Sequence, residues 1–112
     1  MMNQTIIVGR LVRNPELFQS ENGNKFTAIT LATPRNYKNM NGEYDTDFIP
    51  CILWSGIAEN ATTYCHKGDL VAIKGRIQSR KKEENGVNKT IIEVVAEKLT
   101  YLSSKKVDKE EE

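Results

Sequence analysis

The chain has 112 residues, 38% of them hydrophobic and 28% charged, with a formal net charge of +1. This balance excludes an intrinsically disordered chain, which would have fewer apolar residues and a larger net charge, and the length fits a single domain. Apolar runs fall well short of the ~18 residues of a membrane helix, and an early arginine and proline exclude a secretory signal, so we expect a cytoplasmic protein without a membrane partner.

The first half of the chain predicts three strands. Residues 5–12 are rich in β-branched side chains and include Gly9, where we expect a bend or a bulge. Residues 26–33 alternate between apolar and polar side chains and follow an Asn-Gly pair, which is a strong signal for a tight turn. Residues 36–47 are polar and contain a second Asn-Gly pair, so we expect a long hairpin loop there, before a third strand over 47–54.

A change of period after residue 54 predicts the only helix. Ile57, Ala61 and Tyr64 fall on one helical stripe. Ser55 is placed to cap the start of this helix, and Gly68 is placed to end it.

Two further strands follow the helix. Residues 69–79 return to alternation, with an apolar set that ends at Ile77 on one side and a set that contains Lys74 and Arg76 on the other. A third Asn-Gly pair, at 85 and 86, predicts a hairpin, and residues 90–102 form a last strand that we expect to be irregular past Glu97.

This order of elements predicts an all-β fold. A parallel sheet would need a crossover helix between each pair of strands, and the chain predicts one helix only. Five strands with one short helix between strands three and four match the OB-fold, a five-stranded Greek-key barrel that binds oligonucleotides on the face of strands two and three.

The third predicted strand, DFIPCILW, is apolar on both faces, whereas a half-buried strand is polar on one. One alternating set should close the barrel and leave Phe48, Ile52 and Trp54 outside, where exposed aromatic side chains mark a binding or assembly surface. Pro50 cannot donate to the sheet and should lie at an edge or a bulge. The set expected to close the barrel is Ile49, Cys51 and Leu53.

Basic side chains are expected near this outer face. Arg35 and Lys38 flank Tyr37 at the end of the second strand. A mixture of aromatic and basic groups suits single-stranded nucleic acid, because stacking contributes about 1–3 kcal/mol per base and cations pair with the phosphates. The alternatives are that the aromatic residues are core residues and the lysines a solvated sheet edge. A run without acids on the fourth strand contains Lys74, Arg76, Arg80, Lys81 and Lys82.

No motif in the sequence predicts catalysis. The single histidine, His66, follows Cys65, and no nucleophile motif or phosphate-binding glycine loop is present. Cys51 and Cys65 are expected to be packed, reduced thiols rather than metal ligands. We therefore expect no catalytic residue, no metal and no cofactor.

Five segments at matching spacing resemble the bacterial single-stranded DNA-binding proteins over about residues 3–102. They read NQTIIVGRLVRNPEL, FTAITLATPRNY, DTDFIPCILWSGIAEN, YCHKGDLVAIKGRIQSR and IIEVVAEKLTYL. The resemblance implies an OB-fold that binds and protects single-stranded DNA during replication, recombination and repair, independently of sequence and without catalysis. It also implies a homotetramer around which DNA wraps, association with the nucleoid, and a bacterial, phage or plasmid origin.

The resemblance implies roles for individual residues. Tyr37, Phe48 and Trp54 match the family's stacking positions, and Arg80 and Lys81 match backbone contacts. Lys82 stands where the family commonly has an aromatic residue, so we expect a steeper salt dependence than for a Lys82→Trp variant. The full predicted interface is Arg35, Tyr37, Lys38, Phe48, Trp54, Arg76, Arg80, Lys81 and Lys82.

The C-terminal end departs from the family. We expect a folded domain over residues 1–104 and a charged, disordered tail over 105–112. Family members usually continue into a linker and an acidic tip that docks replication and repair enzymes, which makes such docking doubtful for a chain that ends in KKVDKEEE. The sequence leaves open a truncated chain or a short form.

A second function stays open beside DNA binding. The alternative is a primosomal accessory or structural OB-fold protein whose apolar outer face meets another protein. RNA bases would stack on the same aromatic platforms.

Overall fold

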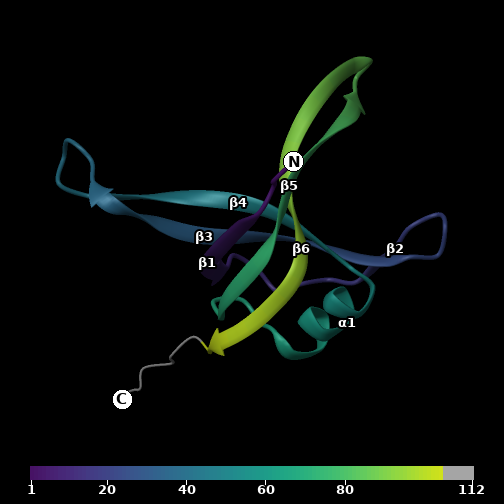
Figure 1. The fold of residues 1–112 in the computed structure, drawn as a ribbon, viewed down its shortest axis with the longest axis horizontal. Coiled ribbons are helices and arrows are strands. Elements are labelled where there is room, and N and C mark those ends of the chain that lie inside the picture. Colours follow the sequence, from purple (N-terminus) through teal and green to yellow (C-terminus); the bar gives the residue numbers. More distant parts are fainter. Residues whose placement is uncertain (105–112) are drawn as a thin grey trace.

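The computed structural model describes residues 1–104, in which five strands close into a barrel (Figure 1). The barrel order is β1–β5–β6–β4–β3, and β1 closes it by pairing with β3 at Arg10 and Leu11. Among the strands of residues 1–104, only β4 and β6 pair in parallel. The elements are β1 (Thr5–Leu11), β2 (Phe18–Gln19), β3 (Lys25–Lys38), β4 (Tyr44–Trp54), α1 (Ser55–Tyr64), β5 (Leu70–Glu84) and β6 (Val87–Ser103).

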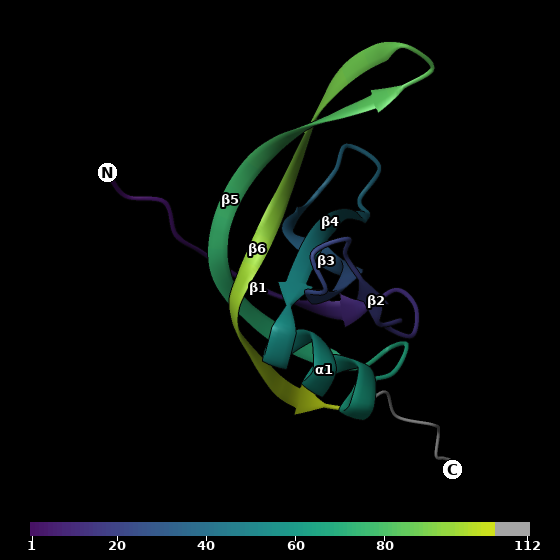
Figure 2. The same cartoon turned by 90° about the vertical axis from the view of Figure 1, so that its right-hand side faces the viewer.

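This architecture confirms the predicted OB-fold. The helix α1 lies between the third and fourth barrel strands, β4 and β5, and Figure 2 shows it at one end of the barrel. The two-residue strand β2 was not predicted, and it pairs with the start of β3. The tail predicted over 105–112 lies outside the described residues.

The barrel interior confirms the predicted orientation of the third barrel strand. Cys51 and Leu53 are fully buried, and Ile49 packs against the same core. Leu31 from β3 and Ile73 from β5 are also fully buried. Burial of each leucine or isoleucine side chain stabilises the fold by roughly 1.5–3 kcal/mol, because its apolar surface is removed from water.

Pro50 lies where its missing N–H leaves no gap in the sheet. Its partner Thr30 directs its carbonyl away from β4, since this oxygen accepts from the Val12 N–H at 3.1 Å. In an antiparallel pair, two directly opposed residues point their N–H and C=O groups either at each other or both away from each other. Because the Thr30 carbonyl points away from β4, the Pro50 nitrogen points away from β3, toward β6. Pairing of β4 with β6 begins only at Cys51. The predicted edge position of Pro50 is therefore confirmed.

The prediction of a long loop over residues 36–47 is wrong. Pairing of β3 with β4 continues to Lys38 and Tyr44, with a register shift after Pro34, and only residues 39–43 form the turn. A two-stranded ribbon pairs its backbone groups whatever its side chains, so polar composition does not end the strands. The predicted Asn-Gly turn itself is present, with Gly42 at φ +80°.

The hairpin between β5 and β6 extends as an arm away from the barrel (Figures 1 and 2). Asn85 and Gly86 form its two-residue turn, both with positive φ, as the Asn-Gly signal predicts. The irregularity predicted past Glu97 is also confirmed, because the register of β6 against β5 shifts there. Ile77 lies on the same side of β5 as the buried Ile73, as the alternation predicts, and it is 46% exposed because the strand has left the barrel by that point.

Gly9 lies where β1 passes close to β3, and it does not form a bulge. The pairing of β1 with β5 runs through Gly9 without a register shift, so the predicted bulge is absent. A Cβ at this position would lie 2.6 Å from Thr33 Oγ1 and 2.8 Å from the Ala32 oxygen. The absence of a side chain therefore lets β1 pass close to β3.

The start of α1 differs from the prediction. Trp54 occupies the N-cap position, and within the described residues this position makes no side-chain capping hydrogen bond. Ser55 is instead the first helical residue, with φ of +54°. The predicted Ser55 cap is wrong because the chain turns directly from β4 into the helix, without an intervening loop.

The end of α1 also differs. The helix ends at Tyr64, and the Cys65 N–H donates to the Ala61 oxygen. Gly68 belongs to the following turn, where its N–H donates to the Leu11 oxygen. Of the helical stripe, Ala61 is buried and Tyr64 is 70% exposed, while Cys65, the next residue, is buried. No helix within residues 1–104 is long and apolar enough to cross a membrane.

Candidate nucleic-acid interface

The outer surface of β4 presents the predicted aromatic residues. Phe48 is 63% exposed and Trp54 is 36% exposed, while the alternating set between them points into the barrel. Ile52 lies between them and is half-buried. The structure therefore places all three side chains outside the barrel, as predicted.

Two further aromatic side chains, which the sequence reasoning missed, extend this surface. Phe26 of β3 lies opposite Trp54, and their ring centroids are 5.2 Å apart. Phe18 of β2 lies opposite Phe26, with the ring centroids 5.7 Å apart. Alternation from the buried residues of β3 could have placed Phe26 outside. We call the whole surface the aromatic face: Phe18, Phe26, Phe48, Ile52 and Trp54.

The side of the sheet that holds the aromatic face continues onto the arm formed by β5 and β6. Ile52 pairs in parallel with Val95 of β6, and Val95 pairs with Arg76 of β5. Arg76, Arg80 and Lys82 alternate along β5 and lie on the same side as Ile52. The structure therefore brings three of the predicted cations to the side of the aromatic face.

Lys81 lies on the opposite side of β5 from Arg80 and Lys82, because neighbouring side chains alternate. Near the tip, Lys82 stands opposite Lys89, and both approach Glu84, at 3.9 and 3.3 Å. The acid offsets part of the positive charge of these lysines. Cations on both faces of the arm remain exposed to solvent.

A hydrogen-bonded network stands beside the aromatic face. Arg80 Nε donates to both carboxylate oxygens of Glu93, at 3.2 and 3.1 Å, and Gln78 Nε2 donates to Glu93 Oε2 at 2.8 Å. Arg76 Nη1 donates to Gln78 Oε1 at 3.4 Å. Glu93 is only 6% exposed. Part of this network and Trp54 line one groove, whose residues are Gln19, Ser20, Glu21, Phe26, Ile52, Trp54, Gln78, Arg80 and Glu93.

Arg35 is not brought to the aromatic face. Its Nη2 donates to Asp47 Oδ1 at 2.9 Å, and its Nη1 lies 3.8 Å from Asp45 Oδ2. Asp47 alternates with Phe48 and pairs with Thr33, so this cluster lies on the other side of the hairpin. The hydrogen bond and the charge of Asp47 raise the pKa of Arg35, and the hydrogen bond from Arg35 lowers the pKa of Asp47.

Tyr37 and Lys38 lie in the shifted part of the β3–β4 hairpin. Tyr37 is 64% exposed. Lys38 Nζ lies 5.8 Å from the ring centroid of Tyr44, an exposed aromatic residue that the sequence reasoning missed. The hairpin tip thus combines aromatic and basic groups beyond the aromatic face.

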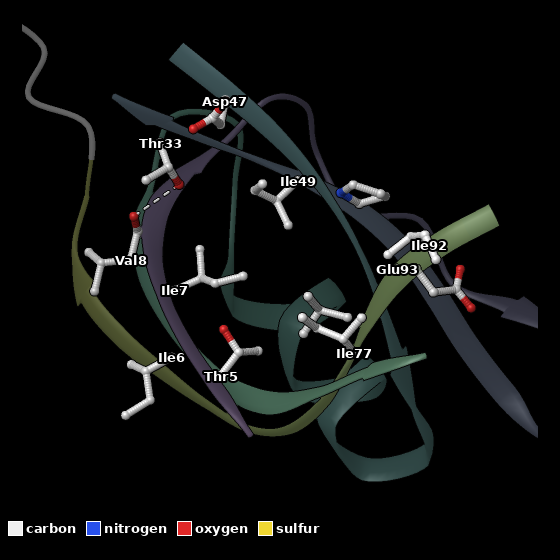
Figure 3. Close-up of a pocket in the computed structure, with 12 residues that line it drawn as sticks. Thr5, Ile6, Ile7, Val8, Thr33, Asp47, Ile49, Ile77, Ile92 and Glu93 are labelled. Carbon is white, nitrogen blue, oxygen red and sulfur yellow. Dashed lines mark hydrogen bonds between the residues drawn. The ribbon is translucent and has the colours of Figure 1, made fainter. Parts of the chain in front are cut away.

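A second apolar surface borders the outer side of β1. Ile6, Val8, Ile77 and Ile92 are each at least 45% exposed and line one pocket, which Figure 3 shows. In that view Ile7 and Ile49 point into the pocket, while Ile6 and Val8 point away from it. Ile77 pairs with the buried Val94 and so lies on the inner side of the sheet, whereas Ile6 pairs with Lys74 and lies on the outer side with Val8. We call Ile6 and Val8 the β1 patch.

The two cysteines are free and buried, as predicted. Burial, with a smaller contribution from the charge of Glu93, raises the pKa of the Cys51 thiol to about 12. Burial also raises the pKa of Cys65. Within residues 1–104, no group of three or more histidine, cysteine or acidic side chains is arranged to hold a metal ion.

Comparison with a family model and comparison with individual known proteins indicate the same protein family. Residues 2–102 match the model of the single-strand binding protein family. The single-stranded DNA-binding protein of Lactiplantibacillus plantarum is 45% identical over 106 residues, which cover 94% of this chain and 53% of that protein. Single-stranded DNA-binding protein B of Bacillus subtilis is 42% identical over 97% of both chains. The chain thus spans about half of the first relative and nearly all of the second.

Proposed function

Since this chain belongs to the single-strand binding protein family, we propose that it binds single-stranded DNA independently of sequence and without catalysis, and protects it during replication, recombination and repair. The observation that carries this proposal is one continuous side of the sheet, on which Phe48 and Trp54 stand beside Arg76, Arg80 and Lys82. Unpaired bases offer flat rings to the aromatic side chains, and the backbone offers regular negative charge to the cations.

The spacing of the aromatic residues supports binding of several nucleotides. Phe48 and Trp54 are six positions apart on β4, which corresponds to about 20 Å along an extended strand. Bases on these two side chains therefore belong to separate nucleotides. Each stacked base contributes about 1–3 kcal/mol, and any base can stack, which accounts for sequence-independent binding.

The cations contribute a salt-sensitive part of the binding. Each phosphate neutralised on a single strand changes the slope of log K against log salt by about −0.7. Contacts from Arg76, Arg80 and Lys82 would together give a slope of about −2. In this proposal Arg35 contributes less, because its guanidinium is bound to Asp47.

We also propose that the chain assembles as a homotetramer, with the β1 patch as one contact. Residues 5–7 of β1 pair with β5 on one side, and β3 meets the other edge of β1 only from Val8 onward, so the edge of residues 5–7 is open to a strand from a second copy. The exposed apolar side chains of the patch favour such burial. Light scattering at micromolar concentration should give four times the chain mass, and a monomer mass would contradict the assembly.

Trp54 provides the test of DNA binding, since it is the one tryptophan of the sequence. A saturating dT oligonucleotide of 35 residues should quench its emission at low salt, because the ring stacks on a base. A 35-base-pair duplex should quench much less, since its bases are already stacked. Unchanged emission together with unchanged anisotropy of a labelled oligonucleotide would refute the proposal and favour a partner-binding OB-fold protein.

A further inference from the structure

Glu93 is an acidic side chain on the side of the sheet that is proposed to bind a polyanion. Its carboxylate lies in the groove beside Trp54, and Figure 3 shows it directed away from the β1 pocket. If charge alone is considered, a carboxylate at this position should repel the phosphates and weaken DNA binding. The contacts of Glu93 suggest the opposite effect.

We propose that Glu93 is a positioning residue for single-stranded DNA, which holds Arg80 and, through Gln78, Arg76 beside the aromatic face. This inference rests on the proposed function. The carboxylate accepts from Arg80 at 3.2 and 3.1 Å and from Gln78 at 2.8 Å. Gln78 in turn accepts from Arg76 at 3.4 Å. One buried acid therefore links two guanidinium groups on the same strand.

The geometry leaves Arg80 able to bind phosphate while it is held. Both contacts to Glu93 use Nε, so the Nη groups, which carry most of the donors, remain available. The Arg80 side chain is 47% exposed, whereas that of Glu93 is 7% exposed. The acid is thus shielded from the DNA path by the cation that it holds, and the cation faces solvent.

Holding Arg80 in place reduces the entropy lost on binding. A free arginine side chain must give up many rotamers when it contacts a phosphate, and here that loss has already occurred on folding. The network also spans two strands, because Gln78 and Glu93 are directly paired across β5 and β6. Arg80 is the diagonal neighbour of Glu93, within reach of a long side chain.

The test compares Glu93→Ala with the wild-type chain by dT binding over a series of salt concentrations. We expect Glu93→Ala to bind roughly 3- to 10-fold more weakly, despite the loss of a negative charge, because an ordered charge-assisted contact is lost. The slope of log K against log salt should become shallower by about 0.7 to 1.4, as one or two phosphate contacts are lost. Glu97→Ala, on the same strand and exposed, is the matched control and should bind as tightly as wild type or slightly tighter.

A double-mutant cycle tests whether Glu93 acts through Arg80. In an Arg80→Ala background, the Glu93→Ala change should weaken binding less than in the wild type and make the salt slope shallower by no more than about 0.7, because only the contact of Arg76, held through Gln78, remains to be lost. Glu93→Gln keeps an acceptor for Arg80 and most of the side-chain shape, and it should fall between wild type and Glu93→Ala. It also serves as the test if Glu93→Ala does not fold, as judged by thermal unfolding.

Three results would overturn the inference. Binding of Glu93→Ala as tight as wild type or tighter would show that the acid only repels DNA. Weaker binding with an unchanged salt slope would show a purely structural role, as would an equal loss in the Arg80→Ala background. Failure of the wild-type chain itself to bind dT would instead refute the proposed function, so the two failures are distinguishable.

Discussion

Phe48→Ala removes a stacking platform with little effect on the fold. The ring is 63% exposed, so its deletion leaves little buried apolar surface unfilled. The neighbours that close the barrel, Cys51 and Leu53, point to the other side of β4. We therefore expect a thermal midpoint close to that of the wild type, and an effect confined to DNA binding.

The size of this effect follows from the stacking energy. A loss of about 1–3 kcal/mol per base corresponds to roughly 5- to 150-fold weaker binding of dT at fixed salt. Because phenylalanine carries no charge, the slope of log K against log salt should stay unchanged. The assay is quenching of Trp54 by a dT oligonucleotide, repeated at two salt concentrations.

Tyr64→Ala is the matched control for Phe48→Ala. Tyr64 is a similarly exposed aromatic residue, 70% exposed, but it lies at the end of α1 and away from the aromatic face. Its removal should leave dT affinity unchanged. Equal affinity of Phe48→Ala and wild type would refute the stacking role, and an equal loss in both variants would show that the effect is not specific to the aromatic face.

Four further predictions concern two threonine hydroxyls and two titrating groups. Thr27 is fully buried and its hydroxyl contacts no partner within residues 1–104, so Thr27→Val should raise the free energy of unfolding by about 1–2 kcal/mol in urea titration; a decrease would show that the hydroxyl is satisfied. Thr33→Val, which loses the donation to the Val8 oxygen, should instead lower it by about 1 kcal/mol. The Cys51 thiol, with its raised pKa, should react with an aromatic disulfide at pH 8 far more slowly in the native than in the urea-unfolded chain; similar rates would contradict its burial. The pKa of Asp47 is lower in the folded chain, so its contribution to stability is present above the ordinary pKa of about 4 and is lost as pH falls through the lowered pKa. The thermal midpoints of wild type and Asp47→Asn should therefore converge in acid. A difference between the two midpoints that stays constant with pH would exclude the ion pair as its cause.

Local patterns in the sequence determined the barrel and the orientation of its third strand. Alternation is a property of the strand backbone itself, so it placed Cys51 inside and Phe48 and Trp54 outside without knowledge of the neighbours. The Asn-Gly pairs likewise act through their own backbone conformations, and the glycines of all three have positive φ. The missing N–H of Pro50 predicted its place in the sheet for the same reason.

Only the tertiary structure decided which side chains meet across strands. Phe18 joins the aromatic face through a two-residue strand that exists only because it pairs with β3. Arg35 is two positions from Tyr37 in the sequence, but the pairing of β3 with β4 brings its guanidinium to Asp47, on the side of the hairpin opposite to Phe48. Glu93 has the sequence context of any exposed strand glutamate, and its burial depends on Arg80 and Gln78 from the partner strand. Alternation is set within one strand, whereas register, and with it every contact between strands, is set by the packing of the whole barrel.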